Sequence, residues 1–208
     1  MAYYTDGPSN IRVENGSLRI AAKKEDVDQR DDMPFTAARI VTRGKHSWRY
    51  GRVQFRANLA SCQAVGTWPA LWMLPEDNVY GGWPRSGEID VMETGAFSSM
   101  YCSVERTMIS DSPVSCVFLV GHELDSRFFG TVHTEAYNGM IGTQKGSNTA
   151  TDNDSWHVFE IDWSETTIKF AVDGRIYFRY SRGEGSTAVW PFDQKVSVER
   201  LVIIFQLK

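Results

Sequence analysis

Residues 156–180 read WHVFEIDWSETTIKFAVDGRIYFRY and contain three segments in which polar and apolar side chains alternate, at 156–163, 168–172 and 175–180. A period of two places the apolar side chains on one face of an extended strand. Asp173-Gly174 separates the last two segments, and Asp-Gly is a favoured two-residue hairpin turn. The stretch therefore predicts consecutive antiparallel strands.

The same pattern recurs nearer the N-terminus. Segments 10–13 and 17–20 alternate around Glu14-Asn15-Gly16, which predicts a second hairpin. Further strands are predicted at 37–42 and 52–57. Many short strands separated by turns, with no segment of convincing helical periodicity, indicate an all-β fold, either an antiparallel sandwich or a jelly roll.

Composition and charge exclude several classes of protein. The 208 residues are 42% hydrophobic and 23% charged, with a formal net charge of -4. This composition suits one globular domain and lacks the positive excess of a nucleic-acid-binding protein. No run approaches the roughly 18 consecutive apolar residues of a membrane span. We therefore expect no nucleic-acid partner and no membrane partner. The chain is also expected to be a monomer, although composition does not decide this.

Metal and cofactor signatures are not evident in the sequence. Cys62, Cys102 and Cys116 form no CxxC pair, and the four histidines show neither an HExxH motif nor a helical i, i+4 spacing. We expect no metal site and no cofactor.

Three carboxylates stand within six residues of the segment SGEIDVMET, residues 86–94. Their apolar and β-branched neighbours predict a strand rather than an acidic loop. In a regular strand Glu88 and Asp90 share one face, while Glu93 points to the other. A single β-bulge near Val91-Met92 would return Glu93 to the side of the other two. Paired carboxylates on one face of a cleft suit a retaining glycosidase.

Two other interpretations of these acids stay open. Clustered carboxylate oxygens suit a calcium ion, and the acids could also form an exposed strand face. Flanking tryptophans favour sugar chemistry: Trp68 and Trp72 share one face of a predicted strand, and Trp83 lies in a loop five residues before Glu88. An indole ring can stack on the C–H face of a sugar, although a single tryptophan is more often a core residue.

Two segments, GTWPALWMLP at 66–75 and GGWPRSGEIDVMET at 81–94, resemble the signature of glycoside hydrolase family 16, in particular its laminarinase-like endo-β-1,3-glucanases. The acidic pattern E-x-D-x-x-E resembles that of laminarinases, agarases and carrageenases, whereas lichenases have E-x-D-x-E. Other segments agree with the family, among them WRYGRVQFRA at 48–57. The resemblance implies a jelly-roll sandwich with a concave substrate cleft.

By this resemblance Glu88 would be the nucleophile, Glu93 the general acid and then base, and Asp90 their supporting carboxylate. The sugar subsites would be lined by Trp83, Arg39, His133, Trp68 and Trp72. His133 could equally be a satisfied core histidine, and Arg39 a structural ion-pair partner.

The chain also departs from the family pattern. We expect a single domain over 1–208 that is incomplete at both termini, and an atypical insertion at 99–128. Family members are usually secreted, which implies the same location here, although the N-terminal residues show no signal-peptide pattern.

The function implied by the resemblance is retaining endo-hydrolysis of internal β-1,3 bonds, or of mixed β-1,3/1,4 bonds, in β-glucan by double displacement. The alternatives are a β-glucan-binding module that does not cut and an inactive truncated relative. Both glutamates of the pattern are present, which favours the enzyme over the binding module.

Overall fold

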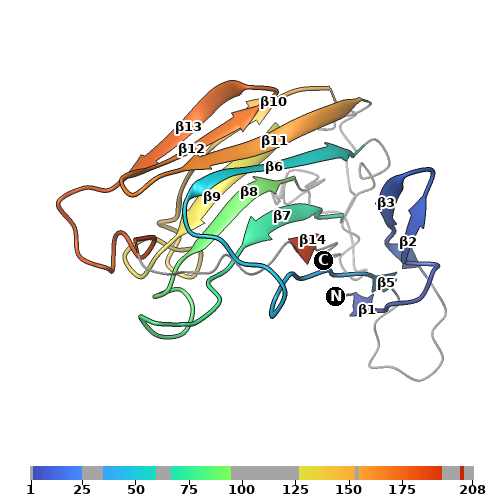
Figure 1. Cartoon of the computed structure of the whole chain (residues 1–208), viewed down its shortest axis with the longest axis horizontal. Helices are drawn as coiled ribbons and strands as arrows, with labels where there is room; N and C mark the ends of the chain where they lie inside the picture. The colour runs from blue at the N-terminus through green and yellow to red at the C-terminus, as the bar shows by residue number, and fades with distance from the viewer. Residues whose placement is uncertain are drawn as a thin grey trace, which may run out of the picture.

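The computed structural model describes residues 2–24, 35–59, 67–94, 127–152, 155–193 and the backbone of 202–203, and the regular elements of these residues are all β-strands. The strands (Figure 1) are β1 Tyr3–Tyr4, β2 Ile11–Glu14, β3 Ser17–Ile20, β4 Lys23–Lys24, β5 Phe35–Ala37, β6 Gly51–Asn58, β7 Ala70–Met73, β8 Glu88–Glu93, β9 Arg127–His133, β10 Lys145–Ala150, β11 Trp156–Trp163, β12 Thr167–Val172, β13 Arg175–Ser181 and β14 Val202–Ile203.

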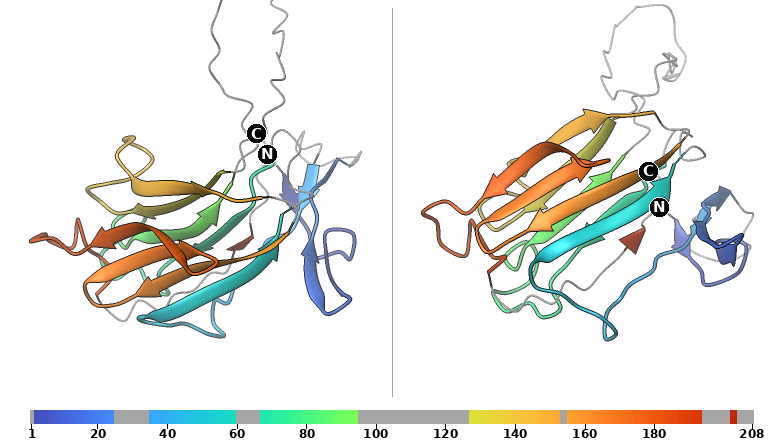
Figure 2. Two further views of the ribbon diagram at one scale, coloured as in Figure 1. Left: turned by 90° about the horizontal axis from the view of Figure 1, so that it is seen from above. Right: turned by 45° about the horizontal axis from the view of Figure 1, so that its top comes forward.

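Two larger sheets form the body of the fold. One has the strand order β10-β9-β8-β7-β14 and the other β13-β12-β11-β6, and all their pairings are antiparallel. The short strands β1 to β5 make two small sheets beside this body (Figures 1 and 2). The prediction of an all-β antiparallel sandwich is confirmed.

Both predicted hairpins are present. β2 pairs with β3 around Asn15-Gly16, and β12 pairs with β13 around Asp173-Gly174. All four turn residues have positive φ, at 51° and 73° in the first turn and 51° and 77° in the second. Type I′ turns require positive φ at both central positions, which Asn, Asp and Gly tolerate best.

The strand predicted at 37–42 is wrong over most of its length. β5 covers Phe35–Ala37 and residues 38–42 are not extended into a ladder. The parallel partner β1 ends at Tyr4, and the Thr5 amide donates the last bond of this pairing to the Ala37 carbonyl, at 2.8 Å. Alternating polarity alone did not show that the partner strand is so short.

Of the stretch 99–128, residues 99–126 lie outside the described residues. Arg127 and Phe128 are the first two residues of β9, an inner strand of the five-stranded sheet. The predicted insertion is therefore described only at its end, where the chain already belongs to the sheet.

The hydrophobic core lies between the two larger sheets. Its buried side chains are Leu71, Met73, Ile89, Val91, Met92, Phe128 and Val132 from the five-stranded sheet, Phe159, Ile161, Trp163, Ile168, Phe170, Val172 and Tyr180 from the four-stranded sheet, and Trp190 and Phe192 from the segment that follows β13. Because β8 packs Ile89 into this core, its neighbours Glu88 and Asp90 must lie on the opposite face of the sheet.

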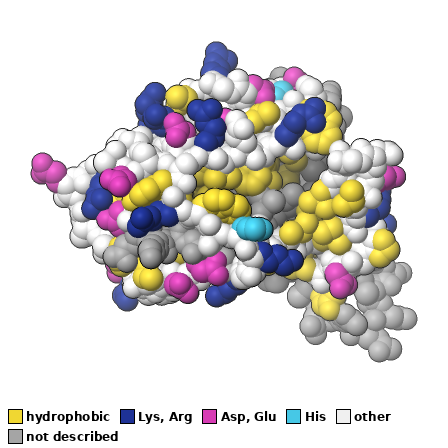
Figure 3. Space-filling view, viewed as in Figure 1, with side chains coloured by type: hydrophobic (Ala, Val, Ile, Leu, Met, Phe, Trp, Pro, Cys, Tyr) yellow, Lys and Arg dark blue, Asp and Glu magenta, His cyan; other side chains and the backbone are white. Residues whose placement is uncertain are grey.

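The surface carries both signs of charge. On the face shown in Figure 3, acidic and basic side chains are interspersed rather than gathered into a basic field. Among the described residues there is no helix long and apolar enough to span a membrane.

The two larger sheets approach each other closely at Gly130, and a substitution at this position can test that packing. A Cβ at this position would lie 2.4 Å from the Tyr177 hydroxyl oxygen and 2.6 Å from Phe170 Cδ1. We expect Gly130→Ala to lower the free energy of unfolding by about 1–3 kcal/mol, as overpacked cores do, and the melting temperature by about 2–4 °C per kcal/mol. Thermal denaturation measures this. Gly183→Ala is the matched control, because no atom lies within 4 Å of its added Cβ; equal melting temperatures for the two variants would contradict the packing.

Candidate active site

The bulge predicted in β8 is confirmed by its pairing on both sides. Against β7, Asp90 pairs with Trp72 and Met92 pairs with Leu71, so two steps on β8 match one step on β7. Against β9, the three steps from Asp90 to Glu93 match only two. β8 thus carries one extra residue between Asp90 and Glu93, which restores Glu93 to the side of Asp90.

All three acids lie on the face of the five-stranded sheet that is turned away from the core, which we call the acidic face. Directly paired residues share a face of a sheet, and the pairs are Glu88 with His133, Asp90 with Trp72 and Thr131, and Glu93 with Ala70 and Phe129. Asp90 is only 2% exposed, and Glu88 and Glu93 are partly buried. The interpretation as an exposed acidic strand face is therefore wrong.

Each glutamate accepts a hydrogen bond from a tryptophan. The indole Nε1–H of Trp68 donates to Glu93 Oε1 at 3.1 Å, and that of Trp83 donates to Glu88 Oε2. Trp83 is nevertheless 44% exposed, so part of its ring remains open to a ligand. The sequence predicted these rings as stacking surfaces or core residues, and their role as hydrogen-bond donors was not foreseen.

Arg39 and Trp72 meet on the β7 side of the acidic face. The Arg39 guanidinium carbon lies 5.3 Å from the centroid of the Trp72 ring, a cation–π distance. Trp72 itself pairs directly with Asp90. All five predicted sugar-contacting residues thus lie close to the acids. Trp68, Trp83 and His133 contact an acid directly, and Trp72 pairs with Asp90 and carries Arg39 over its ring.

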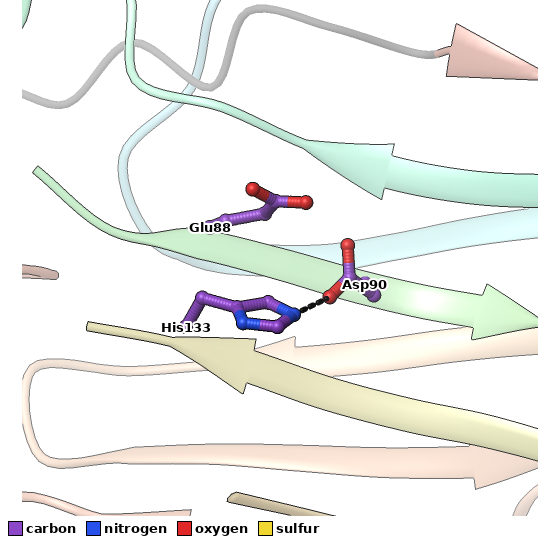
Figure 4. Close-up of side chains that lie close together, drawn as sticks. All are labelled: Glu88, Asp90 and His133. Atoms are coloured by element: carbon purple, nitrogen blue, oxygen red, sulfur yellow. Dashed lines mark ion pairs between the residues drawn. The ribbon is translucent and has the colours of Figure 1, made fainter. Parts of the chain in front are cut away.

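His133 contacts the middle acid. Its Nε2 lies 3.2 Å from Asp90 Oδ2 (Figure 4), and its Nδ1 accepts a hydrogen bond from the Gly139 backbone amide at 3.1 Å. The Trp83 and His133 ring centroids are 5.8 Å apart. His133 is therefore a partnered histidine of the acidic face rather than of the core.

These contacts do not fit a metal ion. One donor atom each from Glu88, Asp90 and His133 lie within 4.8 Å of one another. However, a backbone amide can only donate, so the Gly139 contact occupies the Nδ1 lone pair and leaves the proton of the neutral ring on Nε2. A metal would need the lone pair of that same Nε2, and calcium would need six to eight oxygens. The calcium interpretation finds no support in this cluster.

Comparisons with known proteins agree with this geometry. Residues 116–201 match glycosyl hydrolases family 16. A β-glucanase of Rhodothermus marinus is 39% identical over 204 residues, which are 93% of this chain and 60% of that protein. The X-ray structure of the laminarinase from Rhodothermus marinus superposes with a TM-score of 0.77 at 34% identity, covering 99% of this chain and 72% of the other. The chain belongs to glycoside hydrolase family 16.

A second family 16 structure is that of a variant of SCLam, a non-specific endo-β-1,3(4)-glucanase with a bound glucan. It superposes with a TM-score of 0.74 at 30% identity and covers 99% of this chain and 70% of that one. The predicted jelly-roll sandwich is confirmed by these superpositions. This family 16 chain spans 60% of the length of the Rhodothermus marinus β-glucanase.

The acids of this family 16 site titrate above their ordinary range. Burial, and after it the Asp90 charge, raises the pKa of Glu88 from 4.5 to about 9. Burial and then Glu93 raise the pKa of Asp90 well above its ordinary value, and burial and then Glu88 raise the pKa of Glu93. Glu88 and Asp90 also share a side-chain hydrogen bond. The three carboxyls together therefore retain protons at neutral pH.

Three members of the site were missed by sequence reasoning. Phe129, at 36% exposure, and the buried Thr131 lie on the acidic face opposite Glu93 and Asp90. The alternation of Phe129, Thr131 and His133 along β9 was the available signal, but it falls next to the irregular stretch 99–128. The Gly139 amide left no signal, because a backbone contact six residues from His133 has no sequence pattern.

Removal of the Glu88 carboxyl should stabilise the chain at neutral and alkaline pH. A raised pKa in the folded state means that the unfolded chain binds fewer protons between pH 4.5 and about 9, so the free energy of unfolding falls as pH rises through this window. Gln cannot ionise. We expect Glu88→Gln to raise the melting temperature at pH 8, by about 2–4 °C for each kcal/mol regained, and to raise it less at pH 4. Thermal denaturation at both pH values measures the difference, with the exposed Glu184→Gln as control. An equal rise in melting temperature at pH 4 and pH 8 would contradict the raised pKa of Glu88.

Proposed function

We propose that this chain is a retaining endo-β-1,3-glucanase that hydrolyses internal bonds of β-glucan. The observation that carries the proposal is the bulge in β8, which places Glu88 and Glu93 on one face with Asp90 between them. Retention requires two carboxyls that act from opposite sides of one glycosidic bond. The names of the relatives, laminarinase and endo-β-1,3(4)-glucanase, support β-1,3 linkages or mixed β-1,3/1,4 linkages as the substrate.

In the first step the Glu88 carboxylate attacks the anomeric carbon, and the bond from that carbon to the glycosidic oxygen breaks. Glu93 gives its proton to this oxygen, so the shortened glucan leaves as an alcohol. A covalent glycosyl ester of Glu88 remains. The raised pKa of Glu93, caused first by burial and then by Glu88, keeps this proton available to a higher pH than on an ordinary glutamate.

In the second step the Glu93 carboxylate accepts a proton from water. The water oxygen attacks the anomeric carbon, and Glu88 departs as a carboxylate. Two inversions at the same carbon leave the product with the configuration of the substrate. Glu93 is then protonated again and ready for another cycle.

Asp90 can account for how Glu88 becomes ionised in this mechanism. Glu88 must be an anion to attack, although burial raises its pKa to about 9. The hydrogen bond between the two carboxyls raises the pKa of Glu88 and lowers that of Asp90, so the shared proton rests on Glu88. We propose that it passes to Asp90, the more deeply buried carboxyl, when Glu88 attacks as an anion. The Trp83 indole N–H stabilises the same anion from the other side.

Sugar units of the glucan would lie along the acidic face. The exposed parts of Trp83 and Phe129 offer apolar surfaces near Glu88 and Glu93 respectively. Arg39, His133, Trp68 and Trp72 supply polar edges and further ring surface close by. We propose that the enzyme acts as a secreted monomer, because its polymeric substrate lies outside cells and no step requires a second chain.

Azide rescue distinguishes the roles of the two glutamates. We expect Glu88→Ala to lower kcat on laminarin by about 10⁴-fold or more, and Glu93→Ala by about 10²–10⁴-fold. With an activated aryl β-laminarioligosaccharide, azide should enter the space left by Glu88 and yield the α-glycosyl azide. In the Glu93 variant it should attack the glycosyl ester and yield the β-glycosyl azide. NMR of the products measures the configuration.

Glu184→Ala serves as the control for these variants, because Glu184 is exposed and lies outside β8. If the Glu88 variant gave the β-glycosyl azide and the Glu93 variant the α-glycosyl azide, Glu93 would be the nucleophile and Glu88 the general acid. Binding of laminarin by the wild-type chain without any new reducing ends would favour the glucan-binding module instead.

The two tryptophan donors should move different limbs of the pH profile. Both limbs of the bell in kcat/KM should lie above the ordinary range of glutamate, because burial raises both pKa values. Trp83→Phe removes a donor that favours ionised Glu88, so the rising limb should move up by about one pH unit. Trp68→Phe should move the falling limb up by a similar amount, through Glu93. Each variant is the control for the other, and a shift of the same limb in both would refute the assignment.

A further inference from the structure

We propose that His133 is a positioning residue for Asp90, and that the backbone amide of Gly139 fixes its tautomer. The 134–143 loop would thereby determine which oxygen of Asp90 carries the proton shared with Glu88. The meaning for catalysis rests on the proposed function, whereas the tautomer is a property of the chain that can be measured without any substrate.

The tautomer follows from the donor on Nδ1. The Gly139 amide lies 3.1 Å from His133 Nδ1 and donates to it. A backbone N–H has no lone pair with which to accept, so Nδ1 must be the unprotonated nitrogen. The neutral ring then carries its proton on Nε2. Gly139 also packs against the ring, since a Cβ at this position would lie 3.4 Å from His133 Cε1.

The Nε2 proton faces an acceptor on Asp90. Asp90 Oδ2 lies 3.2 Å from Nε2, on a side chain that is 2% exposed. This oxygen is buried and forms no hydrogen bond of good geometry among the described residues, so its 3.2 Å approach to His133 Nε2 is a close polar contact. The contacts from Gly139 through His133 thus bring an N–H group to 3.2 Å from a buried oxygen that lacks a hydrogen bond, and such an oxygen favours a nearby donor.

The direction of this chain constrains the acids. Because Asp90 Oδ2 faces an N–H donor, it acts as an acceptor, and a proton on Asp90 belongs on the other oxygen. Figure 4 shows that this other oxygen points to the side of Glu88. A proton on this oxygen is therefore held where it can pass between Asp90 and Glu88, which is the exchange proposed above for Asp90.

The surroundings of Asp90 contain few other charges. Glu88 and Glu93 face it from β8 itself, and His133 faces it from β9. β7, which pairs on the other side, contains only Ala, Leu, Trp and Met, and Arg39 lies over its Trp72 ring. Arg85 and Glu135, 3.1 Å apart, also tie the 134–143 loop to the loop that carries Trp83.

The first test is ¹⁵N NMR of the His133 ring at neutral pH. We expect the wild-type chain to show a protonated Nε2 and an unprotonated Nδ1. Gly139→Pro deletes the amide proton, and the Nδ1–H tautomer should become populated. Gly139→Ala keeps the amide, and its Cβ makes an ordinary contact, so the Nε2–H tautomer should persist. A wild-type ring protonated on Nδ1, or identical spectra for the Pro and Ala variants, would overturn the proposal.

A second test uses His133 itself and does not depend on how Pro is accommodated. Gln at this position can place an amide N–H near the site of Nε2, whereas Asn places it near Nδ1. The donor to Asp90 favours ionisation of the pair, so its loss in His133→Asn should move the rising limb of kcat/KM up by about one pH unit. His133→Gln should keep the wild-type limb. Equal shifts in both variants would contradict the positioning role.

The two proposals fail separately in these experiments. If the wild-type chain produces no more reducing sugar from laminarin than Glu88→Gln, the hydrolase proposal fails, while the NMR spectra still decide the tautomer. If the chain hydrolyses laminarin and His133 is protonated on Nδ1, only the positioning role is lost.

Discussion

The extra residue in β8 is the constraint on which the site depends. The core holds Ile89 on the inner face of the strand, and without an irregularity Glu93 would lie on that inner face too, opposite Glu88 and Asp90. The register of β7 and of β9 fixes the bulge from both sides. Since each neighbouring strand is itself paired on its other edge, the position of the third acid is set by the whole sheet.

The same arrangement opposes stability. Three carboxyls lie close together in a region of low solvent exposure, and burial is the first cause of the raised pKa of each. Such a cluster breaks the rule that buried acids carry a compensating charge, as functional sites often do. Its partners are two indole N–H groups and the His133 imidazole, whose effects on the pKa values of Glu88 and Glu93 are smaller than that of burial.

Much of the fold could be predicted from local patterns. Asn15-Gly16 and Asp173-Gly174 specify hairpins because few other residues accept their backbone angles. The bulge was predictable because a regular strand could not place Glu88, Asp90 and Glu93 on one face. In contrast, the end of β5 depends on the length of β1, and the contact of Gly139 with His133 depends on the course of a loop. Neither the end of β5 nor the Gly139–His133 contact produces a periodic pattern in the sequence.

Trp83 both bonds to a carboxyl of the proposed active site and offers an exposed ring to a ligand. Its indole nitrogen is bonded to Glu88, yet 44% of the side chain stays open to solvent. A glucose unit that covers the ring would also shield this hydrogen bond from water and so strengthen it. Affinity and nucleophile orientation are then coupled through one side chain, and a substrate too short to reach the ring would lose reactivity together with binding.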